Sequence, residues 1–298
     1  MALADITSSG ILLPAQAKQF IKLLIKEAVV MKMATVVPMK SMKQQVDKIR
    51  FESRILRAGS EATALPAADH SKPTTSQVEL DAKLFKAEVR LTDELLEDNI
   101  EQGALRNTIL SMMGERLALD MDEVIIQGDT ASADTFLAQF NGILKAATTN
   151  IVNAGTVNLN KNILRDMIKA MPSEFLRRKG DMRYLTSVDA EIDYRDSLSD
   201  RATALGDSNI MSQTSAMYSG IPMSAVPLFP ENLGGGTNCT NVLLLDPKNI
   251  NVGIWRNIRL ETDKDISAGV VKVVATLRFD TKFAHEPAVV KATNVKVT

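Results

Sequence analysis

The chain of 298 residues has 45% hydrophobic and 24% charged residues, and its 35 basic and 36 acidic side chains give a net charge of −1. These values are typical of a folded globular chain and exclude wholesale disorder, which needs few apolar residues and a large net charge. The near-zero charge also argues against a global field that draws the chain to nucleic acid. No apolar run reaches the roughly 18 residues that a membrane span requires. The single cysteine, Cys239, cannot form an internal disulfide, which indicates a reducing compartment.

The residue types that most often carry catalysis are scarce. The chain has two histidines, His70 and His285, and only 4% aromatic residues, although acid–base chemistry near neutral pH most often uses a histidine. We expect both histidines to lie on the surface. The glycine run at 234–236 precedes a strand, so it predicts a turn and not a phosphate cradle. The sequence therefore predicts no catalytic residue, no cofactor-binding residue and no cofactor, with a cryptic enzyme kept as an alternative.

Three acidic residues, Asp120, Asp122 and Glu123, come nearest to a site for a hard cation. On a helix they point in divergent directions, and no glycine-containing calcium loop follows them. One cysteine and two remote histidines cannot build a closed zinc site. We therefore predict no metal ligands, a solvated or partner-facing acidic surface for the three carboxylates, and a partly buried small residue at Cys239.

Residues 1–45 predict an irregular start and then an amphipathic helix. Pro14 suits the first turn of a helix. Apolar residues then recur at three- and four-residue steps, at Ala17, Phe20, Ile21, Leu24, Ile25 and Ala28. Another face carries Lys18, Lys22 and Lys26. We expect a surface helix packed on a core, and the alternative is a basic helix that touches nucleic acid or an acidic partner.

From Val46 to Leu91 the hydrophobic period changes to two. The first run is typical of a half-buried strand, because charged residues alternate with Ile49, Phe51, Ser53 and Ile55. A second run changes its apolar face between Leu84 and Phe85, where we expect a bulge or a change of covered face. Its apolar positions are Val78, Leu80, Ala82 and Leu84, followed by Phe85, Ala87, Val89 and Leu91.

Residues 59–77, between these two runs, are small and polar and should form a mobile tip. A two-stranded hairpin is marginal alone in water, and this tip has no core of its own. We therefore expect the apolar face of the hairpin to be covered by another copy of the chain.

A long helix is predicted from its cap at Thr92 to Gly128. Apolar residues recur at helical spacing along this segment, and the later ones are Met112, Met113, Leu117, Met121, Val124 and Ile125. About 36 residues span roughly 54 Å, close to the diameter of a compact domain of this length, so we expect an elongated subunit. Residues 92–129 carry ten acids and two arginines, whereas residues 1–45 carry six lysines and two acids. Segments of opposite sign suit contacts between copies.

The remaining elements are mainly strands. Phe140–Leu144 (FNGIL) predicts a turn and a short strand, Asn160 can cap a helix that reaches Pro172, and residues 184–187 predict a buried strand. An amphipathic helix follows through Ile192, Tyr194 and Leu198. The later strands are IPMSAVPLF, VLLLD, NVGIW, IRLET, VVKVVATLRF and residues 288–291. Together, the predicted helices and strands make an α+β fold.

This order of elements resembles the tailed-phage major capsid protein of the Hong Kong 97 type over nearly the whole chain. LTDELLEDN and DMDEVIIQGD are similar to the two ends of the family's spine helix, and FNGIL is similar to its short peripheral-domain strand. YSGIPMSAVPLFP and LLLDPKNINVGIWRNIRLETD resemble two later passages of the family. The joint order of these phrases carries the resemblance.

The resemblance implies a Hong Kong 97-like capsid fold with five parts. They are an N-terminal arm and basic helix (1–45), an E-loop hairpin (46–91), the spine helix with peripheral (P) domain strands (92–155), the axial (A) domain (156–262) and a return to the P domain (263–298). It also implies assembly into hexamers and pentamers of an icosahedral shell that encloses double-stranded DNA.

The implied partners are other copies of the chain, a portal, a cement protein, weakly contacted DNA and no membrane. The arm starts about 45 residues before the hairpin and begins at Met1, which favours a separate scaffolding protein over a cleaved segment. The implied location is the virion, with assembly in the host bacterial cytoplasm. An encapsulin-like bacterial nanocompartment shell is the alternative, because it shares the fold. Lys72 and Asn294 match no cross-linking motif, so no covalent cross-link is predicted.

Overall fold

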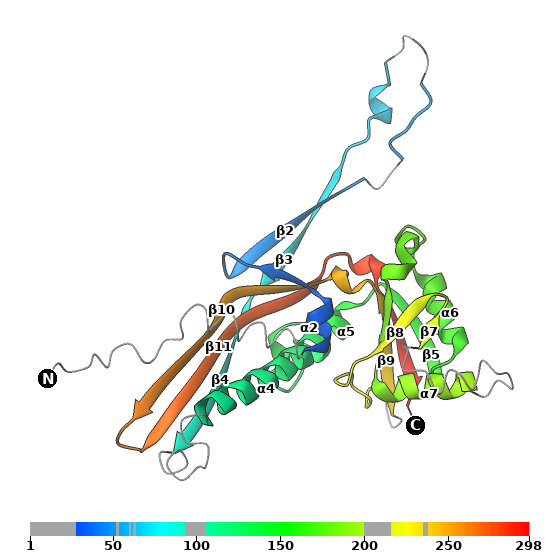
Figure 1. The fold of residues 1–298 in the computed structure, drawn as a ribbon. Coiled ribbons are helices and arrows are strands. Elements are labelled where there is room, and N and C mark those ends of the chain that lie inside the picture. Colours follow the sequence, from blue (N-terminus) through cyan, green and yellow to red (C-terminus); the bar gives the residue numbers. More distant parts are fainter. Residues whose placement is uncertain are drawn as a thin grey trace.

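A computed structural model describes residues 28–51, 54–59, 61, 64–92, 105–199, 216–234 and 238–297. It is a mixed α+β fold of two lobes, one built on a four-stranded sheet and the other on a six-stranded sheet. A long hairpin projects from the first lobe (Figure 1). None of the described helices combines the length and the apolar content needed to cross a membrane. The predicted helix of residues 14–28 lies outside the described residues except for Ala28.

The first lobe is a sheet covered by a long helix. Its strands, in spatial order, are β1 (Thr35–Pro38), β10 (Ile250–Asp265), β11 (Val270–Phe283) and β4 (Lys83–Thr92). In β11 every second residue is buried, as its alternating pattern predicts. These residues are Val273, Ala275, Leu277 and Phe279, which share one core with α4 (Leu105–Gln127).

The described part of the predicted long helix is α4, which ends next to Gly128 as expected. Residues 93–104 lie outside the described residues, and Thr92, the predicted cap, closes β4 instead. Met113 and Met121 are buried, but Met112, predicted to lie on the apolar face, is 62% exposed. The sheet covers only one side of α4, so an apolar residue at Met112 finds no partner within the described chain.

The prediction of a strand at Phe140–Leu144 is wrong, because Ile143 and Leu144 begin the short helix α5 (Ile143–Ala146). The Gly142 amide donates to the carbonyl of Gly128 at 2.8 Å, which folds this segment back under the end of α4. A Cβ at Gly142 would lie 2.6 Å from the Ile125 carbonyl oxygen, so only glycine permits this approach. Helix α5 then buries Ile143 and Leu144 in the core of the first lobe.

The second lobe is a mixed sheet with helices on one face. Its strands, in spatial order, are β5 (Asn150–Asn158), β12 (Val290–Lys296), β9 (Cys239–Leu245), β6 (Arg183–Thr186), β8 (Ile221–Ala225) and β7 (Met217–Tyr218). In β9, Leu243 and Leu245 join the core of the first lobe, whereas Val242 and Leu244 join a second core with α6 (Lys161–Ala170) and α7 (Val188–Ser199). Both faces of β9 are covered, which explains its uninterrupted apolar run.

The sequence predicts the cap of α6 correctly and the apolar face of α7 only in part. The side chain of Asn160 accepts hydrogen bonds from the amides of Asn162 and Ile163, which confirms it as the cap of α6. In α7, Tyr194 is buried, but Ile192 is 54% exposed. Residues two apart on a helix do not share a face, so the two cannot both reach the core.

The predicted strands NVGIW and IRLET form one strand, β10, which bends at register shifts between Ile254 and Arg256 and between Arg256 and Arg259. The chain enters the four-stranded sheet at Ile250 and leaves it after Phe283. The predicted boundary between 262 and 263 therefore falls inside β10, and β12 belongs to the six-stranded sheet. Strand β5, which straddles the predicted boundary at 155/156, also pairs in the six-stranded sheet.

Candidate functional site

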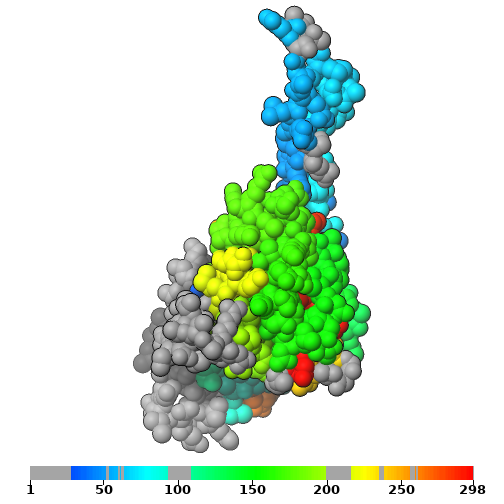
Figure 2. Space-filling model, turned by 90° about the vertical axis from the view of Figure 1, so that its right-hand side faces the viewer, coloured from blue at the N-terminus to red at the C-terminus, as the bar shows by residue number. Residues whose placement is uncertain are grey.

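The hairpin that projects from the first lobe is highly exposed. Strands β2 (Lys43–Arg50) and β3 (Thr74–Asp81) pair antiparallel from Lys43–Asp81 to Arg50–Thr74. Beyond this ladder, the described part of residues 51–73 contains one helical turn, Ala67–Asp69, and no strand. Figure 2 shows the hairpin standing clear of the body as a narrow column.

The outer part of this hairpin exposes apolar side chains. Ile49 is 72% exposed and Leu56 is 84% exposed, and Phe51, Ile55 and Leu65 are each about half exposed. The predicted apolar face, which holds Ile49 and Phe51, has nothing to pack against in the single chain, and β2 ends at Arg50, before Phe51. A ribbon of two strands cannot cover its own apolar face. This surface therefore needs a partner.

A small core anchors the root of the hairpin on the first lobe. It consists of Met39, Leu80 and Ala82, all buried, with Val37, Val46 and Trp255 packed around them. Gly253 in β10 lies against this core, because a Cβ there would come within 2.7 Å of the Met39 sulfur and 3.0 Å of a Leu80 methyl. The root is therefore packed closely against the first lobe.

A buried carboxylate reinforces the root. Asp280 in β11 is 1% exposed, and its two oxygens accept the amides of Asp81 and Thr281, each at 2.8 Å. Burial raises the pKa of Asp280, although the two amides oppose that shift. The Ala82 amide donates to the carbonyl of Met42 at 3.0 Å, so both strands of the hairpin are held where they leave the body.

The chain changes sheets at this root. Strand β3 pairs with β2, whereas β4 pairs with β11. The inward-facing set changes here from Leu80 and Ala82 to Phe85, and Leu84 is 42% exposed. The predicted change of covered face is confirmed, but it lies at Ala82 and not between Leu84 and Phe85. Its position follows from the pairing, because the chain leaves β2 and joins β11 at this point.

One of the three carboxylates predicted to form an acidic surface is buried instead. Asp122 is 1% exposed, and it accepts the amides of Val29, Val30 and Met31 at 2.6, 3.0 and 3.2 Å. It therefore caps α2 (Val29–Met33), where the N-terminal segment joins the first lobe. Burial raises the pKa of Asp122, and the three amides partly offset this. Asp120 pairs with Arg116 at 2.9 Å on the surface.

Replacing Asp122 with alanine is expected to lower the free energy of unfolding by about 2–4 kcal/mol, because it leaves three backbone amides near the core without an acceptor. Glu115, exposed on the same helix, is the matched control, and Glu115→Ala should stay within about 0.5 kcal/mol of the parent chain. Urea unfolding followed by circular dichroism measures both. Equal stability of the two variants would show that the Asp122 contacts do not hold α2.

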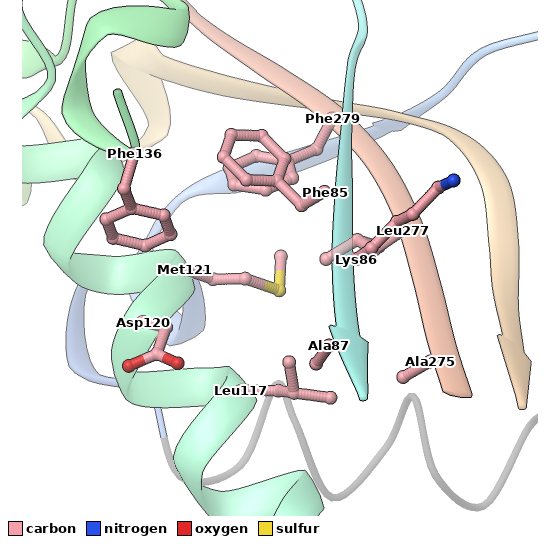
Figure 3. A pocket seen from close by; sticks show the side chains of 10 residues that line it. All are labelled: Phe85, Lys86, Ala87, Leu117, Asp120, Met121, Phe136, Ala275, Leu277 and Phe279. Carbon is pink, nitrogen blue, oxygen red and sulfur yellow. The ribbon is translucent and has the colours of Figure 1, made fainter. Parts of the chain in front are cut away.

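The interface of α4 with the sheet contains a small groove, shown in Figure 3. Leu117 and Met121 of α4 face Phe85, Leu277 and Phe279 of the strands across it, and the charged residues that line it are Lys86 and Asp120. Phe85 stacks on Phe279 with ring centroids 4.7 Å apart and meets Phe136 edge-on at 5.9 Å. The groove is lined mainly by the apolar side chains that pack α4 against the sheet.

The remaining candidate residues are scattered. His70 lies exposed near the hairpin tip, as predicted, with its Nε2 3.3 Å from the Leu65 carbonyl. His285 is half-buried between the lobes, and burial together with the Lys48 and Arg50 cations lowers its pKa, so the expected surface histidine is wrong there. Cys239 is 1% exposed, more buried than predicted. Within the described ranges no three metal-ligating side chains cluster.

The fold is shared with capsid subunits of known structure. A subunit of the satellite phage P4 procapsid, which includes the size determination (Sid) protein, matches with a TM-score of 0.72 and 13% identity over 98% of this chain and 95% of that one. The capsid subunit of a native GTA particle matches with a TM-score of 0.65 and 14% identity over 98% and 94%. The holo-SrpI encapsulin of Synechococcus elongatus PCC 7942 matches with a TM-score of 0.57 and 13% identity over 100% and 98%. The fold of this chain is thus the one found in these capsid and encapsulin subunits.

Sequence comparison identifies the family. The model of the phage capsid family matches residues 9–294. The putative prophage capsid protein YqbE of Bacillus subtilis (strain 168) is 39% identical over 300 residues, which cover 99% of this chain and 96% of the relative. The chain therefore belongs to the phage capsid family, and it is a major capsid protein.

Proposed function

We propose that this capsid protein self-assembles into hexamers and pentamers of an icosahedral shell that encloses double-stranded DNA, and that its role is structural and without catalysis. The exposed apolar hairpin carries this proposal. Ile49, Phe51, Ile55, Leu56 and Leu65 are exposed in the single chain, and the cover they lack is a neighbouring copy.

The lobes correspond in this proposal to the parts of the Hong Kong 97-like subunit. The hairpin is the E-loop, α4 is the spine helix, and the four-stranded sheet is the P domain. The six-stranded sheet with α6 and α7 is the A domain, which would surround the axis of each capsomer. In this proposal β10 and β11, which pair in the four-stranded sheet, belong to the P domain, and β5 and β12, which pair in the six-stranded sheet, belong to the A domain.

The proposed partners follow from the role of a Hong Kong 97-like shell subunit. A separate scaffolding protein, a portal and a cement protein would join the shell, assembly would occur in the host bacterial cytoplasm, and the mature location is the virion. The 39% identity to a prophage capsid protein supports this reading over an encapsulin-like nanocompartment.

Electron microscopy of the purified protein, alone and co-expressed with the scaffolding protein, tests the proposal. Closed shells tens of nanometres across are the expected result. Monomers or small closed rings under every condition would contradict it.

A shell that releases its genome should bind DNA weakly, because many lysine or arginine contacts to phosphate would hold the DNA to the wall. With a net charge of −1, subunits are expected to bind duplex DNA with a Kd weaker than about 10 μM in 0.15 M salt. Fluorescence anisotropy with a labelled duplex measures this. The control variant replaces Lys18, Lys22 and Lys26 with glutamine. Submicromolar binding that this variant abolishes would place the N-terminal segment against DNA.

A further inference from the structure

The outer end of strand β2 contacts the second lobe. Arg50, the last residue of the strand, donates through Nη2 to both carboxylate oxygens of Glu174, each at 2.6 Å. Its guanidinium also lies 5.7 Å from the centroid of the Phe175 ring. Arg50 belongs to the hairpin and Glu174 to the segment after α6, so two parts 124 residues apart in the sequence are joined.

The segment that holds Glu174 borders the junction of the two lobes. At this junction Asn249 donates to the carbonyl of His285 at 2.8 Å and accepts the His285 amide at 2.7 Å. Glu286 accepts the amides of Thr148 and Thr149 at 2.8 and 2.7 Å. The chain passes between the two sheets near residues 148, 249 and 285, and these hydrogen bonds join the three segments to one another. The junction next to Glu174 is therefore well connected.

The hairpin therefore has two anchors on different lobes. The first is the root, where Asp81 meets Asp280 and Leu80 packs on Met39. The second is Arg50, seven residues farther along β2 than Lys43, or about 23 Å at the rise of an extended strand. A ribbon held only at its root can swing, whereas a second contact at this distance determines its direction.

We propose that Arg50 and Glu174 are positioning residues that form a latch, which sets the direction of the hairpin relative to the six-stranded lobe before assembly. The inference rests on the proposed function, in which the hairpin packs on a neighbouring subunit, because its direction then decides which surface it reaches. The two side chains are 38% and 50% exposed. An exposed ion pair is weak and screened by salt, so contacts with a neighbour can displace it.

The surroundings of the latch make Glu174 the more sensitive partner. The charged residues and the histidine that line one cavity with Glu174 are Arg177, Arg178, Lys248, His285 and a second acid, Asp246. The Arg50 and Lys48 cations act on His285 from the hairpin side. Glu174→Gln removes the carboxylate that both hydrogen bonds from Arg50 require, so it should release the hairpin at least as fully as Arg50→Gln.

Distance measurement in unassembled full-length subunits tests the latch. Spin labels are placed at Ile49→Cys on β2, inside the paired ladder, and at Ile192→Cys on α7, both exposed positions, with the buried native cysteine removed by Cys239→Ala. The parent should give one narrow distance distribution. Arg50→Gln and Glu174→Gln should broaden or shift it, and the exchanged pair Arg50→Glu with Glu174→Arg should restore it.

The matched control is Arg57→Gln, which breaks an exposed ion pair with Asp69 at 3.3 Å inside the hairpin tip and joins no lobe. It should leave the distribution unchanged. An unchanged distribution in both Arg50→Gln and Glu174→Gln would overturn the latch, whether or not the protein forms shells.

Shell yield gives the second readout. Arg50→Gln should lower the yield by about five-fold, the upper range for an exposed ion pair, with an unchanged unfolding midpoint. Full yield in a variant with a broadened distribution would overturn the role of the latch in assembly and leave the proposed shell function standing.

Discussion

Met121→Asp is expected to unfold the subunit. Met121 is 3% exposed and lies between α4 and the sheet, opposite Phe85 and Leu277 (Figure 3). An aspartate there would hold an unpaired charge in the core at a cost of several kcal/mol, comparable with the about 5–15 kcal/mol that stabilises a typical domain. Circular dichroism and urea unfolding of the purified variant measure the loss.

The matched control is Glu115→Gln on the exposed face of the same helix, which should change the free energy of unfolding by less than about 0.5 kcal/mol. A folded Met121→Asp variant of parent stability would show that the α4 face assigned to the core is wrong.

Shortening the hairpin is expected to leave the subunit folded and to abolish shell formation. Arg50 and Thr74 are the last paired residues of the ladder, so replacing residues 51–73 with Asn-Gly closes it with a two-residue turn. The replaced segment contains Phe51, Ile55, Leu56 and Leu65, all exposed, and contributes nothing to the described buried core. The neighbour loses the apolar surface it would cover, so closed shells should be absent from electron micrographs.

Two measurements make this result specific. The unfolding midpoint should stay within a few degrees of the parent, because the root core of Met39, Leu80 and Ala82 is kept. A tip variant that keeps the apolar side chains, His70→Asn, should assemble normally, since His70 is exposed and polar. Normal shell yield and heat resistance in the shortened variant would contradict the role proposed for the hairpin.

Features that depend on neighbours in the sequence could be predicted. The cap at Asn160, the alternation in β11 and the end of α4 before Gly128 all rest on contacts within a few residues. The order of the elements also carried the resemblance to the capsid family.

Features that depend on distant segments were predicted incorrectly. Asp122 looks like a surface acid in the sequence, yet it caps α2 from 91 to 93 residues away. Ile143 and Leu144 suit a strand, but the close approach of Gly142 to Gly128 folds them into α5. The position of the face change at Ala82 depends on which strand each part pairs with.

The sequence by itself therefore determined the α+β class, most of the helices and strands, the exposed hairpin and the family. Only the tertiary structure decided how the two sheets divide the chain, where the hairpin is rooted and that Arg50 reaches Glu174. Secondary-structure propensity and hydrophobic periodicity depend on residues close together in the chain, so the sequence alone shows them. Burial of a carboxylate or the pairing of two side chains depends on which distant segments the packed core brings together, and periodicity contains no information about that choice.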